Sequence, residues 1–185
     1  MKNKIREIII SDLHRYHGRV SFFLFIKSLL FVKGFKFSFW LRLAKHYEKN
    51  RLLRIIPKLM FGYYKRVLVS DINYRADIGY ALCIRHVFAT TFGGSTVIGN
   101  NVTILHSVTL GEKNGSYPII GDNVYLGSGC CVLGGVTIGN NVIIGANAVV
   151  TKNIPENSIV VGNPGKIISS NGSPLAVKNP YNKEL

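Results

Sequence analysis

The sequence is poor in acidic residues and in cysteines. Its 185 residues include 9 Asp and Glu against 23 Lys and Arg, and three cysteines at positions 83, 130 and 131. Adjacent cysteines such as Cys130 and Cys131 seldom bridge each other without strain. The cysteine content therefore excludes a secreted disulfide framework, and we expect three reduced, mostly buried thiols.

Membrane-spanning and export signals are also missing. No apolar run reaches the roughly 18–20 residues of a transmembrane helix, because Lys27 and Lys33 interrupt the best one. The N-terminal residues lack the apolar core and small-residue cleavage site of a signal peptide. We therefore expect a cytoplasmic protein, at most peripheral on the inner face of the cytoplasmic membrane.

The positive charge is concentrated in the N-terminal part. Residues 1–70 carry 16 Lys and Arg against 3 Asp and Glu, whereas residues 71–185 carry 7 against 6. Three helices are predicted in this part, over residues 21–33, 37–49 and 52–69. The first two flank Gly34, and the third begins or bends at Pro57. Residues 1–70 are thus predicted to form a basic α-helical region.

Basic, aromatic-rich helices suit two kinds of surface. They can cap the following domain and pack in an oligomer, or they can lie on an anionic membrane surface. Both interpretations remain open for residues 1–70. We expect no nucleic-acid partner, because no recognisable binding motif is present.

From residue 72 onward, large apolar residues recur at every sixth position, apart from two phase breaks. They stand at Ile72, Ile78, Ile84, Phe92, Ile98, Ile104, Leu110, Ile120, Leu126, Val132, Ile138, Ile144 and Val150. The Gly, Asn and Asp residues between them readily adopt the left-handed backbone conformation that sharp corners require. Three such units close a triangular coil of about 18 residues. We predict a mainly β fold, a parallel β-helix over residues 71–168 and a tail over 169–185, because a sandwich of short strands would not hold this phase.

The two phase breaks indicate where the binding face lies. Two extra residues fall between Ile84 and Phe92, and four extra residues fall within 111–119. Residues 112–117 should therefore protrude as a polar loop. In repeat proteins such insertions map to loops on one face, often the binding face.

Two histidines in the repeat region could perform chemistry. His86 and His106 are each the third residue of a unit, and they are 20 residues apart. This spacing places them at the same corner, about one coil apart and facing a groove. A histidine is suited to act as the base that activates a hydroxyl. A metal site is disfavoured because no third histidine lies in this region.

A catalytic histidine also needs a group that fixes its tautomer. Asp71 is the best acidic candidate and Asp77 the second, although Asp71 could instead cap the junction between helix and coil. An oxyanion donor is required as well. Backbone N–H groups near Gly111 or Gly127 could supply it, and the sequence does not choose between them.

These residues carry a family pattern. It comprises Asp71-Ile72-x5-Ile78-Gly79, His86, Ser107-Val108-Thr109-Leu110-Gly111, Val161-Gly162-Asn163-Pro164-Gly165-Lys166 and Lys33-Gly34-Phe35. The pattern resembles the serine acetyltransferase branch of the hexapeptide-repeat acyltransferases, from about residue 12 to 168.

The resemblance implies a left-handed parallel β-helix and a homotrimer with active sites between subunits. It implies acetyl-CoA as the acyl donor and no metal, with His86 as general base, Asp71 as its orienting partner and His106 as a further catalytic candidate. The expected donor-binding residues are Gly111, Gly127, Ser128, Ala146, Pro164 and Lys166.

The sequence departs from serine acetyltransferases where the amino acid should bind. Arg85 stands where the family has an aspartate before the catalytic histidine, and Tyr117 stands where it has a histidine before the proline. An acidic residue of the helical domain is also missing around residues 19–21. We therefore expect Arg85 and Tyr117 to contact a different acceptor.

Our main hypothesis is O-acetylation of a sugar hydroxyl in surface polysaccharide synthesis, such as capsule, O-antigen or exopolysaccharide. Short, basic relatives of the same branch resemble this chain and act at the membrane. The alternative is a serine O-acetyltransferase of cysteine biosynthesis. A third hypothesis, of another class, is a membrane-recruited trimeric scaffold without activity.

Overall fold

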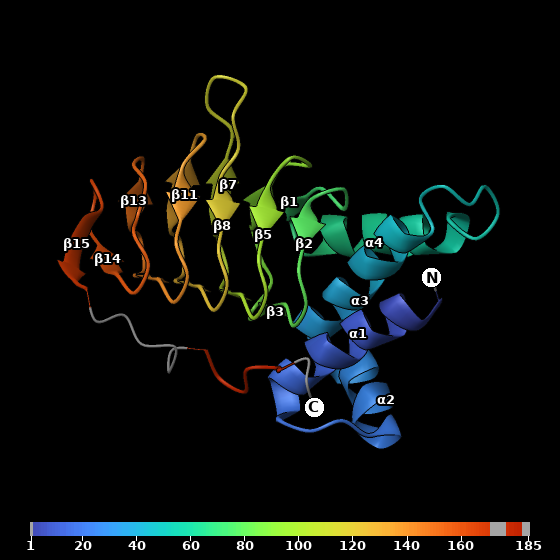
Figure 1. Ribbon diagram of the computed structural model, residues 1–185. Helices are drawn as coiled ribbons and strands as arrows, with labels where there is room; N and C mark the ends of the chain where they lie inside the picture. The colour runs from blue at the N-terminus through green and yellow to red at the C-terminus, as the bar shows by residue number, and fades with distance from the viewer. Residues whose placement is uncertain (1, 171–176, 183–185) are drawn as a thin grey trace.

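The computed structural model describes residues 2–170 and 177–182, in which a helical region is followed by a parallel β-helix (Figure 1). The helices are α1 (Lys2–His17), α2 (Phe22–Phe31), α3 (Lys33–His46) and α4 (Ile55–Val67). None of the described helices has the length and apolar character needed to cross a membrane.

The predicted repeat positions form the strands of the β-helix. Every predicted repeat residue, from Ile72 to Val150, is the buried second residue of its strand, in β1 to β13. Their side chains form a continuous core inside the coils, which confirms the predicted fold. The strands are β1 (Asp71–Ile72), β2 (Asp77–Ile78), β3 (Cys83–Ile84), β4 (Thr91–Phe92), β5 (Val97–Ile98), β6 (Thr103–Ile104), β7 (Thr109–Gly111), β8 (Ile119–Ile120), β9 (Tyr125–Leu126), β10 (Cys131–Leu133), β11 (Thr137–Ile138), β12 (Ile143–Ile144), β13 (Val149–Val150), β14 (Ile159–Val161) and β15 (Lys166–Ser169).

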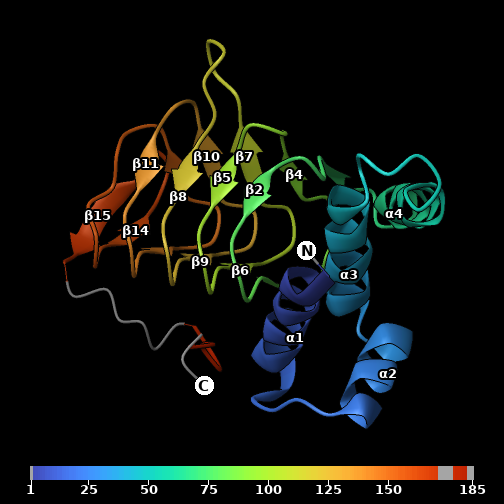
Figure 2. The same cartoon turned by 45° about the vertical axis from the view of Figure 1, so that its right-hand side comes forward.

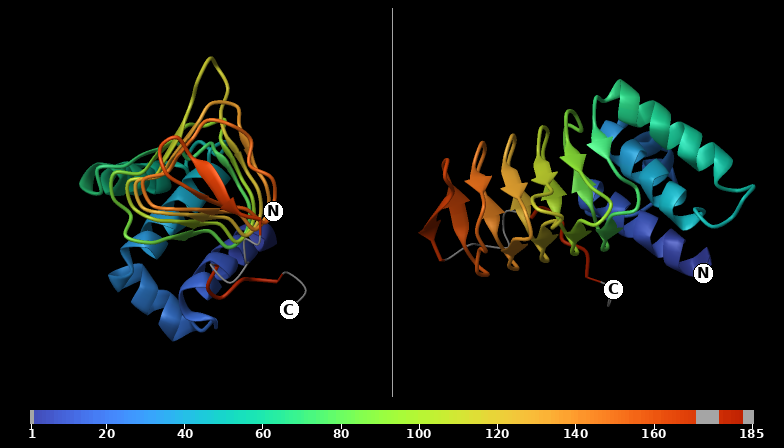
Figure 3. Two further views of the ribbon diagram at one scale, coloured as in Figure 1. Left: turned by 90° about the vertical axis from the view of Figure 1, so that its left-hand side faces the viewer. Right: turned by 90° about the horizontal axis from the view of Figure 1, so that it is seen from above.

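Three sheets form the faces of a triangular prism, which Figure 3 shows end-on. Face A contains β1, β4, β7, β10 and β13; face B contains β2, β5, β8 and β11; face C contains β3, β6, β9, β12, β14 and β15. The strand pairs are parallel, except that β15 runs antiparallel to β14. Each coil passes from A to B to C, so the faces meet at three edges. The C/A edge comprises the turns 85–90, 105–108, 127–130 and 145–148.

Stacked asparagines stabilise the B/C edge. The side-chain amide of Asn123 donates to Asn141 at 3.1 Å, and that of Asn141 donates to Asn157 at 2.9 Å. Their backbones are left-handed, with φ of 56°, 59° and 58°. Asparagine tolerates this conformation better than most residues do, which explains its recurrence at the corners.

The helical region differs from its prediction at the N-terminus and around Gly34. The sequence patterns miss α1, because its apolar residues are interrupted by the buried polar residues Asp12 and Arg15. The break between α2 and α3 falls at Val32, so Gly34 lies inside α3. A side chain at Gly34 would overlap the carbonyl oxygen of Ile84. Glycine therefore allows α3 to approach β3 closely.

A buried ion pair joins two helices to the first coil. Helices α1 and α3 lie side by side across the end of the β-helix (Figure 2). Arg42 of α3 donates to both carboxylate oxygens of Asp12 of α1 at 3.0 Å, and also to the carbonyl oxygens of Ile78 at 2.8 Å and Gly79 at 2.7 Å. Asp12 in turn accepts the N–H of Leu82 at 2.8 Å. Burial raises the pKa of the Asp12 carboxyl, and the Arg42 guanidinium opposes this shift.

Other polar side chains of α1 bind the first two coils. Arg15 donates to the carbonyl oxygen of Ala81 at 2.9 Å and to the Thr103 hydroxyl at 2.8 Å. The Tyr16 hydroxyl donates to the carbonyl oxygen of Ile84 at 2.9 Å and accepts its N–H at 3.1 Å. These side chains satisfy backbone groups that would otherwise be left at an open sheet edge.

Residues 177–182 lie beside α1, at the helical end of the molecule (Figure 1). The carbonyl oxygen of Lys178 accepts Arg15 Nε at 3.0 Å. The backbone N–H and C=O of Tyr181 pair with the side-chain amide of Asn101 at 2.8 and 3.2 Å. The described end of the chain thus binds both the helical region and the B/C edge.

The cysteines carry free thiols, as the sequence predicts. Cys83 and Cys130 are buried, and Cys131 is half-buried. Burial raises the pKa of the Cys130 thiol to about 12.

Removing one partner of the buried ion pair should destabilise the protein strongly. We expect Arg42→Ala to lower the free energy of unfolding by about 3–5 kcal/mol, because it leaves Asp12 buried without its counter-charge. Chemical denaturation followed by circular dichroism measures this. Arg75→Ala is the matched control, because Arg75 pairs with Glu48 at the surface and should change stability little. Equal effects of the two substitutions would contradict this assignment.

Candidate active site

The C/A edge brings most of the candidate residues into one line. His86 follows β3, His106 follows β6, Gly127 and Ser128 follow β9, and Ala146 follows β12. These strands are stacked neighbours on face C, so the turns that follow them are stacked too. The line extends from the helical end of the prism toward its far end.

His86 lies in the two-residue insertion and faces solvent. Its backbone is left-handed, with φ of 54°. Strand pairing aligns Ile84 with Ile104, but the N–H of Ser107 donates to the carbonyl oxygen of Phe88 at 2.8 Å. The insertion therefore stacks His106 over Phe88, and His86 bulges from the edge beside it. His106 is also exposed, and its Nδ1 lies 3.3 Å from the Ser107 hydroxyl.

Asp71 begins β1 on face A. It lies on the same C/A edge as His86, one coil nearer the helices. Its carboxylate is 77% exposed and forms an ion pair with Lys65 Nζ at 2.6 Å. Among the described residues, no hydrogen bond joins Asp71 to His86. The ion pair links the last turn of α4 to β1, as expected for a cap at the junction between helix and coil. Asp77, the second acidic candidate, lies on face B and pairs with Lys45, away from the C/A edge.

A hollow of about 460 Å³ opens beside His86. Its lining includes Lys33 and Lys36 from α3 and Tyr64 from α4. The Nζ of Lys36 donates to the carbonyl oxygen of Leu30 at 2.8 Å and lies 5.7 Å from the centre of the Tyr64 ring. Of these three residues, only Lys33 belongs to a sequence motif, Lys33-Gly34-Phe35. The hollow therefore offers positive charge beside an exposed imidazole.

The absence of a side chain at Gly127 lets the turns in the middle of the C/A edge stack closely. A Cβ at Gly127 would lie 2.8 Å from the backbone nitrogen of Ala146 and 2.8 Å from the carbonyl oxygen of Ile144. The turns can stack this closely only because the side chain is absent. The N–H of Gly127 donates to Ile144 at 2.8 Å and is therefore not free to stabilise an oxyanion.

Residues 162–166 complete the edge at its far end. The N–H of Gly165 donates to the carbonyl oxygen of Val149 at 2.7 Å, and the N–H of Val149 donates to Gly162 at 3.0 Å. Pro164 is exposed next to these bonds, and Lys166 begins β15 with an exposed side chain. A long, thin ligand lying along the edge would meet Pro164 and Lys166 after passing Gly127, Ser128 and Ala146.

Two candidate residues lie on another edge. Tyr117 ends the loop 112–117, which projects from the A/B edge between β7 and β8, and its ring packs where a side chain on Gly93 would stand. Gly111 ends β7 on the same edge. Arg85, in contrast, is half-buried on the C/A edge next to His86. One chain therefore separates Tyr117 and Gly111 from Arg85 and His86 by the width of face A.

The described residues contain no group of three or more His, Cys, Asp or Glu that could hold a metal ion. Near Cys83, burial raises the pKa of the thiol, and the Arg15 and Arg85 guanidinium groups oppose this shift.

Comparison with known proteins identifies similar enzymes. The family described as bacterial transferase hexapeptide (six repeats) matches residues 117–152. The mitochondrial serine acetyltransferase 3 of Arabidopsis thaliana is 34% identical over 154 residues, which cover 81% of this chain and 39% of that protein. The serine acetyltransferase of Staphylococcus xylosus is 38% identical over 137 residues, which cover 72% and 63%. The chain thus spans less than two thirds of the length of these curated relatives.

Solved structures agree with these matches over more of the chain. The Neisseria gonorrhoeae serine acetyltransferase in complex with serine superimposes with a TM-score of 0.77 at 31% identity, covering 90% of this chain and 70% of that one. The soybean serine acetyltransferase apoenzyme gives a TM-score of 0.77 at 32% identity, covering 90% and 69%.

These relatives correct the hypothesis of a sugar acceptor in polysaccharide synthesis. All of them are serine acetyltransferases, and they favour the alternative hypothesis. The sugar hypothesis rested on the departures at Arg85, Tyr117 and residues 19–21 and on the short, basic helical region. Single departures such as these are outweighed by a similarity that extends over most of the chain.

The close stacking at Gly127 predicts a loss of stability when a methyl group is added. We expect Gly127→Ala to lower the free energy of unfolding by about 1–3 kcal/mol, because backbone atoms on both sides leave no room. Gly62→Ala in helix α4 is the control, because a Cβ there meets nothing within 4 Å, and it should stabilise by about 0.5–1 kcal/mol. Thermal and urea unfolding measure both. A neutral Gly127→Ala would show that the edge is not tightly stacked.

Proposed function

The chain belongs to the serine acetyltransferase branch of the hexapeptide-repeat acyltransferases, and on this basis we propose that it transfers an acetyl group from acetyl-CoA to the hydroxyl of L-serine. One observation carries the proposal most directly. The exposed His86 shares a continuous edge with the glycine-containing turn at Gly127 and with the Pro164 turn.

In the proposed reaction His86 is the general base. It takes the proton from the serine hydroxyl as the oxygen bonds to the acyl carbon. It then gives the proton to the sulfur as the carbon–sulfur bond breaks. A hydroxyl is a poor nucleophile at neutral pH, so this proton transfer contributes typically 10²–10⁴-fold. Acetyl-CoA would supply the acyl group as an activated thioester.

Asp71 is proposed to orient the His86 ring. Its exposed carboxylate lies on the same edge, and it would exchange Lys65 for the imidazole when the acceptor is bound. Such an orienting hydrogen bond fixes the tautomer that leaves the reacting nitrogen unprotonated. His106 is proposed to assist in the same groove, since it is exposed and stacks one coil farther along.

The donor is proposed to lie along the C/A edge. Gly127, Ser128 and Ala146 offer a surface without large side chains, on which the pantetheine arm can lie close to the backbone. The exposed Lys166 supplies positive charge for phosphate groups beyond Pro164.

The positions of Tyr117 and Gly111 support a homotrimer. If the A/B edge of one subunit faces the C/A edge of the next, the loop 112–117, Tyr117 and Gly111 would reach a neighbour's His86. A threefold ring closes with three identical contacts of this kind. Each active site would then be completed by two subunits.

The serine carboxylate is proposed to bind in the hollow beside His86. Lys33 and Lys36 line this hollow, and Arg85 adds a third positive charge next to the base. The acidic residues that the family pattern has at the position of Arg85 and around residues 19–21 are absent here. This chain would therefore hold serine mainly through its carboxylate.

Replacing the proposed base should abolish most of the activity. We expect His86→Ala to lower kcat with L-serine and acetyl-CoA by at least ~10²-fold, with little change in the KM for acetyl-CoA. The release of CoA measures the rate. His106→Ala is the comparison, because a helper in the groove should lose less than the base. Wild-type protein that releases no CoA with L-serine would contradict the proposed function.

The carboxylate interaction can be tested with a substrate that lacks it. We expect Lys36→Ala and Lys33→Ala to raise the KM for L-serine by about tenfold, as for a lost hydrogen bond to a charged group. With serinamide, which has no carboxylate, the same substitutions should change the KM little. Lys58→Ala is the control, because Lys58 lies over the Tyr74 ring and is not part of the hollow. Equal losses with both substrates would contradict this role.

A further inference from the structure

Most exposed large apolar side chains of the described chain lie in the helical region, on two helices. On α2, Phe22, Phe23 and Phe31 are 81%, 73% and 76% exposed. Ile26 and Leu30 are exposed as well, and residues 22, 26 and 30 follow one face at a spacing of four. An apolar helix face that no part of its own chain covers is unusual in a folded domain.

Helix α4 repeats this pattern. Ile55, Leu59, Tyr63 and Val67 are spaced by four residues and are all exposed, as is Ile56. The opposite side of α4 packs on the core through Phe61. We call the two exposed faces together the α2–α4 surface. It comprises Phe22, Phe23, Ile26, Leu30, Phe31, Ile55, Ile56, Leu59, Tyr63 and Val67.

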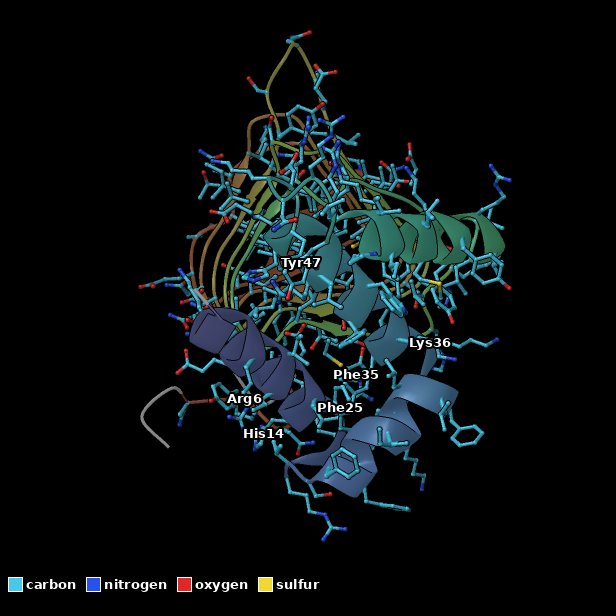
Figure 4. All side chains as sticks on the ribbon, turned by 90° about the vertical axis from the view of Figure 1, so that its right-hand side faces the viewer. Arg6, His14, Phe25, Phe35, Lys36 and Tyr47 are labelled. Carbon is cyan, nitrogen blue, oxygen red and sulfur yellow. The ribbon has the colours of Figure 1, made fainter. Side chains whose placement is uncertain are left out.

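The two helices lie on the same side of the molecule. Helices α2 and α4 project on one side in Figure 4, where Lys36 is labelled between them, and Figure 3 shows the same side from the other end of the prism. A single flat partner could therefore contact both helices.

The charge around the α2–α4 surface is almost entirely positive. From residue 19 to residue 70 the chain has 12 Lys and Arg and one acidic residue, Glu48, which pairs with Arg75 at the surface. Exposed cations border the apolar residues at both helices, including Arg19 and Lys27 at α2 and Arg54 and Arg66 at α4. The partner must therefore accept apolar side chains and many positive charges together.

This combination distinguishes between the possible occupants. A second copy of the same surface would bring two strongly positive regions into contact, and like charges at an interface oppose association. An anionic phospholipid bilayer accepts aromatic side chains at the depth of its head groups and attracts the surrounding lysines and arginines. None of the described helices could span the bilayer, so the contact would be parallel to its plane.

We propose that the α2–α4 surface binds the face of an anionic phospholipid bilayer. Phe22, Phe23 and Phe31 insert among the head groups, and the bordering cations contact lipid phosphates. The hollow beside His86 borders this surface, because Val67 belongs to the surface and also lines the hollow. Membrane binding would therefore hold the C/A edge close to the bilayer, and it does not depend on which acceptor is acetylated.

Vesicle flotation with the full-length protein tests the proposal. Wild-type protein should float with phosphatidylcholine vesicles that contain about 30 mol% phosphatidylglycerol, remain unbound to phosphatidylcholine alone, and be released at high salt. The triple variant Phe22→Ser, Phe23→Ser, Phe31→Ser should bind at least ~tenfold less. Ile167→Ser is the control: Ile167 is also exposed but lies on β15, far from α2 along the prism (Figure 1), and the variant should float like the wild type.

Circular dichroism and acetyl transfer to serine should be unchanged in the triple variant, which separates lost binding from lost folding. The proposal would be overturned if the wild-type protein does not float with anionic vesicles. It would also be overturned if the triple variant binds them as well as the wild type does. If gel filtration instead shows that the triple variant loses an assembly which the wild type forms without lipid, the occupant is a second copy of the chain.

Discussion

The ion pair of Arg42 with Asp12 connects the parts of the molecule that differ most in architecture. A parallel β-helix ends in a coil whose backbone groups face no further strand, and such an edge is a site for unwanted pairing. Here one guanidinium binds a carboxylate of α1 and two carbonyl oxygens of the first coil. Because both charges are buried, each depends on the other. The orientation of the helices, and with it the hollow beside His86, follows from this contact.

The candidate site depends on a second constraint, the regular stacking of the turns. Each coil places its C/A turn above the previous one, so residues about one coil apart in sequence become neighbours in space. The insertion at His86 breaks this order once and lifts the base out of register with His106. The regular part of the edge can hold an extended donor such as acetyl-CoA. The insertion lets the His86 side chain project from the edge toward the reacting groups. The separation of Tyr117 from this edge explains why one chain presents only part of the proposed site.

The repeat made the β-helix predictable from sequence, because burial of one residue in six imposes a period that no other fold shares. The line from His86 to Pro164 follows from the same period. Helix α1 was not predictable, since Asp12 and Arg15 look like surface residues until the first coil is present to bind them. The role of Gly34 and the hollow formed by Lys33, Lys36 and Tyr64 depend likewise on how α3 and α4 pack. The identity of the acceptor was misjudged because the departures at Arg85 and Tyr117 were given more weight than the overall similarity to serine acetyltransferases.

The return of residues 177–182 to α1 has a consequence for the order of folding. The parallel strand pairings join residues 16 to 22 positions apart, so the coils can form one after another as the chain is synthesised. The bond from Arg15 to Lys178 spans 163 residues, and closing so long a loop is the slowest kind of contact to form. Helix α1 can therefore dock on the first coil early, but its last bonds wait until residue 178 has left the ribosome.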